Sequence, residues 1–478
     1  MKSNLIHIKI GVFILLTLGF WSCKSSKINF KEPDQNLPVQ FQEAMVDSAN
    51  IAKIDWRTYF GDENLSKLID TALVNNQELN IVLQEIAISK AEVLEKQGEY
   101  LPFVDIGIAA ETEKVGRFTR NGAVEHNLLI DEDKEFPEPL SDFKLAATAS
   151  WEVDIWRKLR NAKDATQLRY VAQNEGKNFL VTQLISEIAE SYYELMALDN
   201  LLITINQNVQ IQQTALENMR LLKDYSKANQ LGVNRFEAQL LNTKNQQYAI
   251  KQKITETENK LHFLIGSYPT TISRNSNELM TMKLDSLQAG IPSQMLENRP
   301  DIRQAELEMA AAKLDVKSAK ANFYPKLDLK AGLGYQAFNP KFLFNPESLI
   351  YNIAGDLVAP LINRKGIKAQ FNKASAMQIQ SVYAYQKTLL NAYTDVLNQL
   401  AKLNNYSESL NVKTKEVELL KQSVNIANDL FKYAKADYVE VLLTQEEVLD
   451  AQMELIETKL EQVNAKVQLY RALGGGWR

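Results

Sequence analysis

The sequence predicts an α+β membrane protein in which very long helices accompany a few membrane-length strands, arranged as two tandem repeats. Three observations support this prediction. Residues 177–231 and 367–473 contain neither glycine nor proline, which favours uninterrupted helices. Four segments of about ten residues alternate apolar and polar side chains, as membrane-crossing strands do. Finally, blocks of sequence recur at a spacing of roughly 200 positions, which indicates a duplicated fold half.

The helices are predicted from their length and their apolar seams. A single helix over 367–473 would be roughly 160 Å long, and its apolar seam weakens between Phe431 and Tyr438, so we expect the chain to reverse there. From the helices alone, a soluble bundle or a periplasmic adaptor hairpin is the alternative. Long helices are expected over about 157–224, 233–265, 366–432 and 438–473, and shorter ones over about 77–100 and 300–323. The seam of the first long helix reads Leu184, Ile188, Tyr192, Leu195, Leu198, Leu202, Ile205 and Val209.

The alternating segments predict strands over about 103–115, 141–155, 326–338 and 349–361. Each is long enough to cross a bilayer when tilted, with one apolar and one polar face. Four strands cannot close a barrel, and open strand edges are forbidden in hydrocarbon. Several chains must therefore combine, and three would supply one shared 12-stranded β-barrel. A soluble sandwich also alternates, but such helices do not usually accompany one.

The internal repeat sets the expected domain organisation. Pro102 and Pro325 stand 223 positions apart in similar surroundings, whereas Gly266 and Gly474 stand 208 apart, so the first copy carries a longer insert. The expected segments are a signal peptide (1–22), a lipid-anchored N-terminal segment (23–55), the first repeat (56–266), an equatorial linker (267–298), the second repeat (299–474) and a short tail (475–478).

The N-terminus has the pattern of an export signal. Lys2 and Lys9 precede an apolar run that is too short to span a bilayer as a helix. The single cysteine, Cys23, stands where this run ends, after the small Ser22. The arrangement resembles a bacterial lipoprotein signal and predicts lipidation of Cys23. An ordinary cleaved signal with an incidental thiol is the alternative.

Composition argues against several functions. The formal net charge is −5, which disfavours a nucleic-acid partner. One cysteine and three widely spaced histidines give no basis for a metal site, and no cofactor is expected. No nucleophile–base pair or phosphate loop stands out, so we do not expect an enzyme. Trp151, Glu152, Asp154 and Trp156 could suggest a sugar site, but aromatic residues and acids at a strand end are more often interfacial anchors.

Several segments resemble the trimeric TolC-like outer-membrane efflux factors, in particular their lipoprotein branch in pumps of the resistance-nodulation-division type. The most specific string is Arg299-Pro-Asp-Ile-Arg-Gln-Ala-Glu306, and Ala321–Leu329, Trp151–Trp156 and Asp437–Leu442 also match. The resemblance implies an exit duct in the outer membrane of a Gram-negative bacterium. A periplasmic adaptor and an inner-membrane pump would be its partners. Proline at a helix start followed by an acid suits a helix cap, so we assign a structural role to Arg299, Pro300, Asp301, Arg303 and Glu306.

The two turns between long helices are the expected periplasmic tips. Glu440 occupies a position where the family has Asp, and with Asp437 it is our candidate for a periplasmic gate. The two acids lie three residues apart, on one face of a helix start. Repeated around a trimer axis, they would form a cation-holding ring, although both could instead be capping charges. The candidate adaptor contacts are Ser226, Gly232, Val233, Ala434 and Ala436.

We therefore expect passive conduction of small molecules to the exterior. Export of metal ions or of proteins (type I) through the same kind of duct is the nearest alternative. A periplasmic scaffold or adaptor lipoprotein is the alternative from another class.

Overall fold

The computed structural model describes residues 28–34, 37–38, 40–41, 51–131, 133–282, 290–360, 362, 364–433 and 435–478. They form two compact units. The first contains the described parts of 28–32, 88–170 and 307–382, and the second contains those of 33–87, 171–306 and 383–478. The predicted signal peptide and Cys23 lie outside the described residues.

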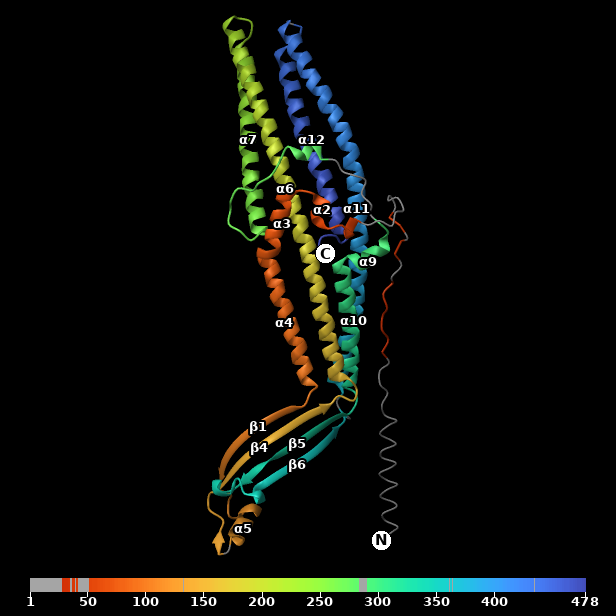
Figure 1. Ribbon diagram of the computed structural model, residues 1–478. Helices are drawn as coiled ribbons and strands as arrows, with labels where there is room; N and C mark the ends of the chain where they lie inside the picture. The colour runs from red at the N-terminus through yellow and green to blue at the C-terminus, as the bar shows by residue number, and fades with distance from the viewer. Residues whose placement is uncertain are drawn as a thin grey trace. The chain divides into compact units, whose positions relative to one another are not determined.

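The first unit is built on a four-stranded antiparallel sheet with the order β1-β4-β5-β6 (Figure 1). Its strands are β1 (Phe103–Glu113), β4 (Leu140–Val153), β5 (Lys326–Ala337) and β6 (Leu349–Val358). Each repeat therefore contributes one hairpin, and the two hairpins meet where β4 pairs with β5. Alternation of side chains along each strand gives the sheet two chemically different faces.

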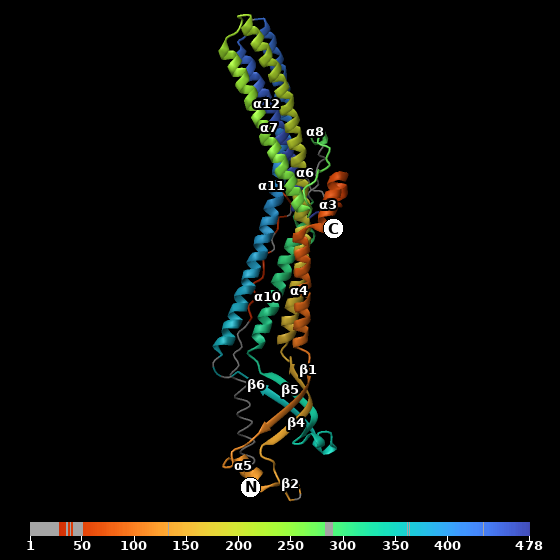
Figure 2. The ribbon, with the colours of Figure 1, turned by 90° about the vertical axis from the view of Figure 1, so that its left-hand side faces the viewer.

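The two hairpins differ in the excursions that connect their strands. Residues 114–139, between β1 and β4, include α5 (Arg120–Asn127) and the small hairpin of β2 (Leu129–Asp131) and β3 (Lys134–Glu135) (Figure 2). Residues 338–348, between β5 and β6, hold only the single turns η3 (Pro340–Phe342) and η4 (Pro346–Ser348). The first excursion is about 15 residues longer, which accounts for the two spacings of the sequence repeat.

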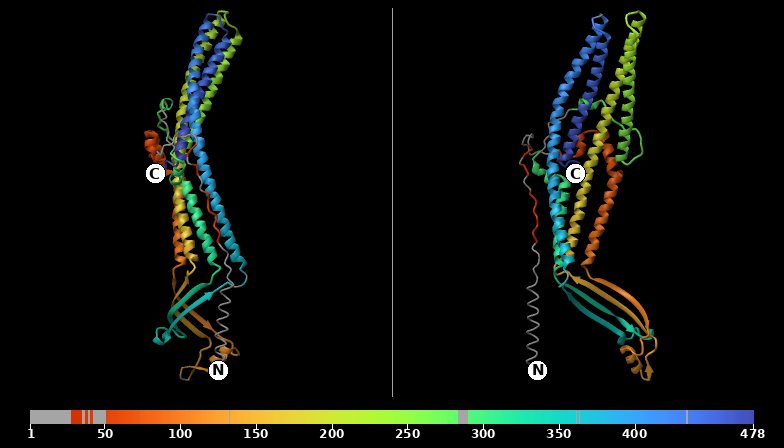
Figure 3. Two further views of the ribbon diagram at one scale, coloured as in Figure 1. Left: turned by 90° about the vertical axis from the view of Figure 1, so that its right-hand side faces the viewer. Right: turned by 180° about the vertical axis from the view of Figure 1, so that it is seen from behind.

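The second unit consists of helices, which pack as two antiparallel hairpins (Figure 1 and Figure 3). α6 (Lys158–Asp224) reverses into α7 (Gln230–Leu264), and α11 (Lys365–Lys432) reverses into α12 (Tyr438–Ala472). α4, α6, α10 and α11 contribute residues to both units. The remaining helices are η1 (Ile51–Lys53), α2 (Trp56–Phe60), α3 (Glu63–Asn75), α4 (Gln77–Glu99), α8 (Glu278–Thr281), η2 (Pro292–Gln294), α9 (Met295–Asn298) and α10 (Pro300–Ala321).

The core of the second unit follows the apolar seam of α6. Ile188, Tyr192, Leu195 and Ile205 are fully buried, as their three- and four-residue spacing predicts. The buried Tyr192 hydroxyl donates to Asp62 Oδ2 at 2.9 Å. Asp62 in turn caps α3 by accepting the main-chain N–H groups of two residues in its first turn. The seam thus fixes the hairpin and the short helices together.

Two helix starts differ slightly from the sequence-based ranges. α7 begins at Gln230, three residues before the expected start, so Gly232 and Val233 lie within its first turn. The reason is local: Asn229 Oδ1 accepts the main-chain N–H of Gly232 at 3.0 Å, and this cap outweighs the low helix propensity of glycine. α6 begins at Lys158, after a turn in which Arg157 has a positive φ of 58°. None of the helices among the described residues is both long and apolar enough to cross a membrane.

Candidate functional site: sheet faces, strand ends, helical turns and joints

One face of the four-stranded sheet carries no charged side chain. Directly paired residues share a face, so Ile106, Ala147, Leu333 and Tyr351 form one row across it. Ile106, Leu333 and Tyr351 are 78%, 59% and 79% exposed. A continuous exposed apolar surface of this kind marks a face that lipid or another protein covers.

The opposite face is charged. Glu152 pairs with Asp328, and Asp328 pairs with Asp356, so three acids lie side by side on neighbouring strands. Each has its own lysine: Lys158 at 2.5 Å from Glu152, Lys326 at 2.7 Å from Asp328 and Lys330 at 3.7 Å from Asp356. These lysines offset the repulsion that adjacent like charges would otherwise cause.

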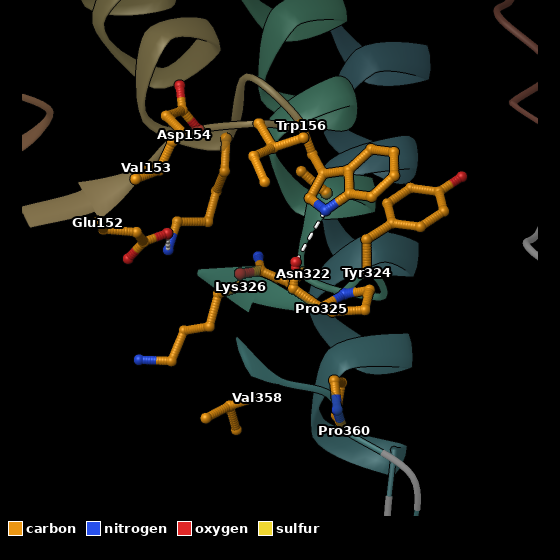
Figure 4. A pocket seen from close by; sticks show the side chains of 13 residues that line it. Glu152, Val153, Asp154, Trp156, Asn322, Tyr324, Pro325, Lys326, Val358 and Pro360 are labelled. Carbon is orange, nitrogen blue, oxygen red and sulfur yellow. Dashed lines mark hydrogen bonds and ion pairs between the residues drawn. The ribbon is translucent and has the colours of Figure 1, made fainter. Parts of the chain in front are cut away.

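A small hollow of about 230 Å³ lies where β4 ends and β5 begins (Figure 4). Trp156 stacks on Tyr324 beside it with 4.7 Å between ring centroids, and the indole N–H of Trp156 donates to Pro325 O at 2.8 Å. The indole N–H of Trp151 likewise donates to Tyr100 O. Both tryptophans are therefore held by backbone carbonyls, as interfacial anchors are.

The acids at this strand end are also already engaged. Asp154 accepts the main-chain N–H groups of Leu159 and Arg160 and the guanidinium of Arg160, and so caps α6. Burial tends to raise the pKa of Asp154, but these donors outweigh it and the pKa is lowered. Glu152 is paired with Lys158. The arrangement favours structural anchoring over the sugar-site reading of Trp151, Glu152, Asp154 and Trp156.

The turn between α6 and α7 is closed by main-chain hydrogen bonds. Ser226 has a left-handed φ of 57°, and Lys227 N donates to Leu222 O at 2.8 Å. Ser226 is exposed, whereas Gly232 and Val233 are buried in the start of α7. Of the three predicted contact residues in this turn, Ser226 is therefore the exposed one.

The turn between α11 and α12 repeats this geometry, since Lys435 N donates to Leu430 O at 2.8 Å. Asp437 is exposed and directly precedes α12, but its side chain makes no capping hydrogen bond. Glu440 is exposed in the first turn of α12. Ala436 is half-buried, and Ala434 lies outside the described residues. Both candidate gate acids are therefore accessible to solvent. A capping hydrogen bond does not account for an acid at position 437.

The two turns also contact each other through a glycine. A Cβ on Gly232 would lie 3.4 Å from the sulfur of Met219 and 3.7 Å from the ring of Tyr438. The first residue of α12 thus packs against the start of α7. The absence of a side chain at Gly232 leaves room for this aromatic ring.

The Arg299–Glu306 motif lies at the start of α10, with Pro300 as its first residue and Asp301 in the first turn. Buried Arg299 holds Asp301 through two hydrogen bonds, of 3.0 and 2.7 Å. Arg303 pairs with Glu175 at 2.7 Å, whereas Glu306 is exposed. The motif joins helices and bears no reactive group.

The sequence analysis did not predict that Arg299 of this motif binds the end of another helix. Arg299 Nη1 donates to the carbonyl of Ala472, the last residue of α12, at 2.7 Å. In the first repeat, Asn76 Nδ2 donates to the carbonyl of Leu264, the last residue of α7, at 2.8 Å. The carbonyls that end a helix lack internal partners, and these side chains satisfy one in each repeat. Applying the offsets of 223 and 208 to Arg299 and Ala472 would have identified the equivalent pair.

Among the described residues, no group of three or more His, Cys, Asp or Glu side chains is placed to hold a metal ion. Three carboxylates of the charged sheet face, those of Glu152, Asp328 and Asp356, are each paired with a lysine.

Comparison with known proteins identifies relatives over nearly the whole chain. The cation efflux system protein CusC of Escherichia coli is 26% identical over 459 residues, which cover 94% of this chain and 95% of that protein. The solvent efflux pump outer membrane protein SrpC of Pseudomonas putida is 27% identical over 425 residues, with 88% and 87% covered. The solved open state of the MtrE outer membrane channel of Neisseria gonorrhoeae superposes with a TM-score of 0.82 at 20% identity, covering 95% of this chain and 99% of that one.

These similarities confirm the predicted fold class and the predicted role in efflux at the outer membrane. The family described as outer membrane efflux protein matches residues 68–267 and 291–475, the greater part of both repeats. The chain therefore belongs to the outer membrane efflux protein family.

Proposed function

We propose that three copies of this chain form the exit duct of a tripartite efflux pump and conduct small molecules passively from the periplasm to the exterior. The observation that carries the proposal is the uncharged, exposed face of the four-stranded sheet. Such a face suits lipid, and the charged face then lines a bore. Transport through such a duct requires no chemistry from the chain.

The strand edges support assembly from several copies. β1 and β6 each pair on one side only, which leaves two edges of unpaired main-chain groups. Unpaired edges are not tolerated in hydrocarbon. If β1 of one copy pairs with β6 of the next, three copies close a barrel of twelve strands.

The helices offer matching contact surfaces. Val412, Leu419 and Ile426 of α11 and Tyr433, the residue after it, recur every seven residues and are 58–68% exposed. Leu241 and Tyr248 of α7 are also seven residues apart and exposed. Apolar residues at this spacing form the seam of a coiled coil, so both stripes suit a neighbouring copy.

A substitution pair tests the membrane placement of the sheet. Leu329 lies on the uncharged face and Lys330 on the charged one. Leu329→Arg is expected to reduce insertion because a cation on the lipid face costs about 2–4 kcal/mol near the midplane. Lys330→Arg is the matched control and should be tolerated. Equal amounts of inserted protein from both variants would contradict the placement.

Asp437 and Glu440 are proposed as a periplasmic gate. Tyr438, which lies between them, is proposed to hold the α11–α12 turn against the start of α7. Acids repeated around an axis hold cations and repel one another. Glu440→Gln combined with Asp437→Asn should lower the cation preference of single channels in planar bilayers and weaken block by multivalent cations. Unchanged selectivity and block, with intact trimers, would leave both acids without a gating role.

The partners and the cargo follow from the same proposal. A periplasmic adaptor would contact Ser226, Ala434 and Ala436 at the turns, and an inner-membrane pump would supply the energy. Export of metal ions is the second candidate, because CusC is named for cation efflux. Measuring cell sensitivity to metal cations and to organic toxicants after deletion of the gene separates the two.

Lipidation of Cys23 is proposed from the sequence alone. Wild-type protein should incorporate labelled palmitate, and Cys23→Ser should not. Absence of label from the wild type would remove the anchor from this account without affecting the duct.

A further inference from the structure

We propose that a basic hollow beside the end of β4 and the start of β5 binds the phosphate headgroup of an anionic phospholipid. The hollow measures about 550 Å³, a volume typical of ligand sites. It lies between the start of α6 and the end of α10, within the first unit. Its lining includes Arg157, Lys317, Lys320, Trp156, Tyr324 and Ile28.

The cations of the hollow outnumber its acids. Lys317 and Lys320 stand three residues apart on α10, hence on one face of the helix. Neither forms an ion pair with any residue that the structure describes. Asp164 is the acid in the lining, and it is shared by Arg157 at 3.4 Å and Lys163 at 3.6 Å. The two free ammonium groups are therefore available to an anion.

The other wall is apolar and rigid. Trp156 and Tyr324 stack with an interplanar angle of 25°, and the hydrogen bond from Trp156 to Pro325 O fixes the indole (Figure 4). Ile28 and Leu314 add aliphatic surface. A ligand with an anionic group and an apolar body matches this division, whereas inorganic phosphate would leave the apolar wall unused.

The position of the hollow selects a lipid over a soluble ligand. Trp156 follows the last residue of β4 by three positions, and Tyr324 precedes the first residue of β5 by two. The uncharged sheet face ends at this level, which places the hollow at the membrane boundary if the proposed orientation holds. Aromatic residues and lysines at that boundary meet headgroups.

Lipid binding to the purified full-length protein tests this proposal. Phosphatidylglycerol and phosphatidylcholine are titrated against detergent-solubilised protein, and retained lipid is counted by native mass spectrometry. Lys317→Gln with Lys320→Gln should weaken phosphatidylglycerol retention about 25-fold, since each lysine near a membrane surface contributes roughly fivefold. Lys365→Gln with Lys368→Gln is the matched control: these exposed lysines begin α11 after β6 and do not line the hollow.

Three results would overturn the proposal. They are equal phosphatidylglycerol retention by wild type and the Lys317/Lys320 variant, equal loss in both lysine pairs, and complete displacement of the lipid by inorganic phosphate. The last would assign the hollow to a free phosphate. Single-channel conductance is recorded on the same samples, because failure of the duct appears there and not in lipid counts.

Discussion

The two repeats end their returning helices in the same way but with different chemistry. At the end of α7 the neutral amide of Asn76 holds the last carbonyl, and at the end of α12 the guanidinium of Arg299 does so. Arg299 also meets Asp301 and, at 3.7 Å, Asp395 of α11. Arg471 approaches Asp395 from α12 at 3.3 Å. The duplicated fold keeps the backbone requirement, and the second repeat adds a charge network that ties α10, α11 and α12 together.

The turns at the other end of these helices diverge more. In the first repeat Asn229 caps α7 and Gly232 leaves room for Tyr438. At the equivalent positions of the second repeat stand Asp437, which does not cap, and Glu440. We call the contacts of Asn76 with Leu264 and of Arg299 with Ala472 the joints. Duplication preserved the joints, where backbone groups need partners, and allowed the turns to acquire different side chains.

The largest difference is expected at the joints. Arg299→Met leaves Asp301 without its partner and Asp395 with Arg471 alone, so it should cost about 3–5 kcal/mol of unfolding free energy. Asn76→Leu leaves the carbonyl of Leu264 and the main-chain N–H of Leu79 without their partner and should cost about 1–3 kcal/mol. Denaturant unfolding of the solubilised protein, followed by circular dichroism, measures both. Equal losses would mean that the charge network adds nothing.

The glycines that follow the returning helices should respond alike. Gly266 and Gly474 have φ values of 66° and 90°, and an added Cβ would meet Asn75 O at 2.3 Å and Asn298 O at 2.5 Å. Alanine at either position should cost about 1–3 kcal/mol, through strain of this backbone conformation. Gly98→Ala is the control, because a Cβ there meets open space within α4, and it should stabilise by roughly 0.5–1 kcal/mol. A loss confined to one repeat would break the equivalence of the joints.

The smallest effects are expected at the caps. Asn229→Ala removes a capping hydrogen bond and should cost about 1 kcal/mol. Asp437→Ala removes none and should cost roughly half of that or less, through the helix dipole alone. Thermal unfolding of the two variants measures the difference between these stability losses. If Asp437→Ala proves the more damaging, Asp437 is primarily a structural residue and its proposed gating role loses its basis.

Elements of the fold could be predicted where a pattern within one short segment of sequence indicated them. Alternation in 143–155 indicated β4, and the seam from Leu184 to Val209 identified the buried side of α6, because both report a periodic exposure to one core or one surface. The role of Asp395 and the pairing of Asn76 with Leu264 were not predictable in this way. They depend on contacts between residues 76 to 188 positions apart, which no local pattern encodes.

The candidate site shows the same limit. Glu440 was identified because it stands where the family has Asp, and Asp437 because it lies on the same face of the helix start; both residues are exposed. The seating of Tyr438 against Gly232 could not be predicted, because it requires the two turns to meet in space. The basic hollow was also missed, since Arg157, Lys317 and Ile28 come from three separate segments.

The central claim, that separate copies join through β1 and β6, is tested most directly by disulfide cross-linking. Within one chain β4 and β5 separate these strands by about 14 Å, beyond the roughly 7 Å that a disulfide can bridge between Cα atoms. In a Cys23→Ser background, Ile106→Cys is combined in turn with cysteine at Tyr351, Ile353, Gly355 or Leu357. The account predicts that at least one pair yields a denaturant-resistant ladder ending at three chains. Single chains at every pairing, or a ladder extending beyond three, would contradict it.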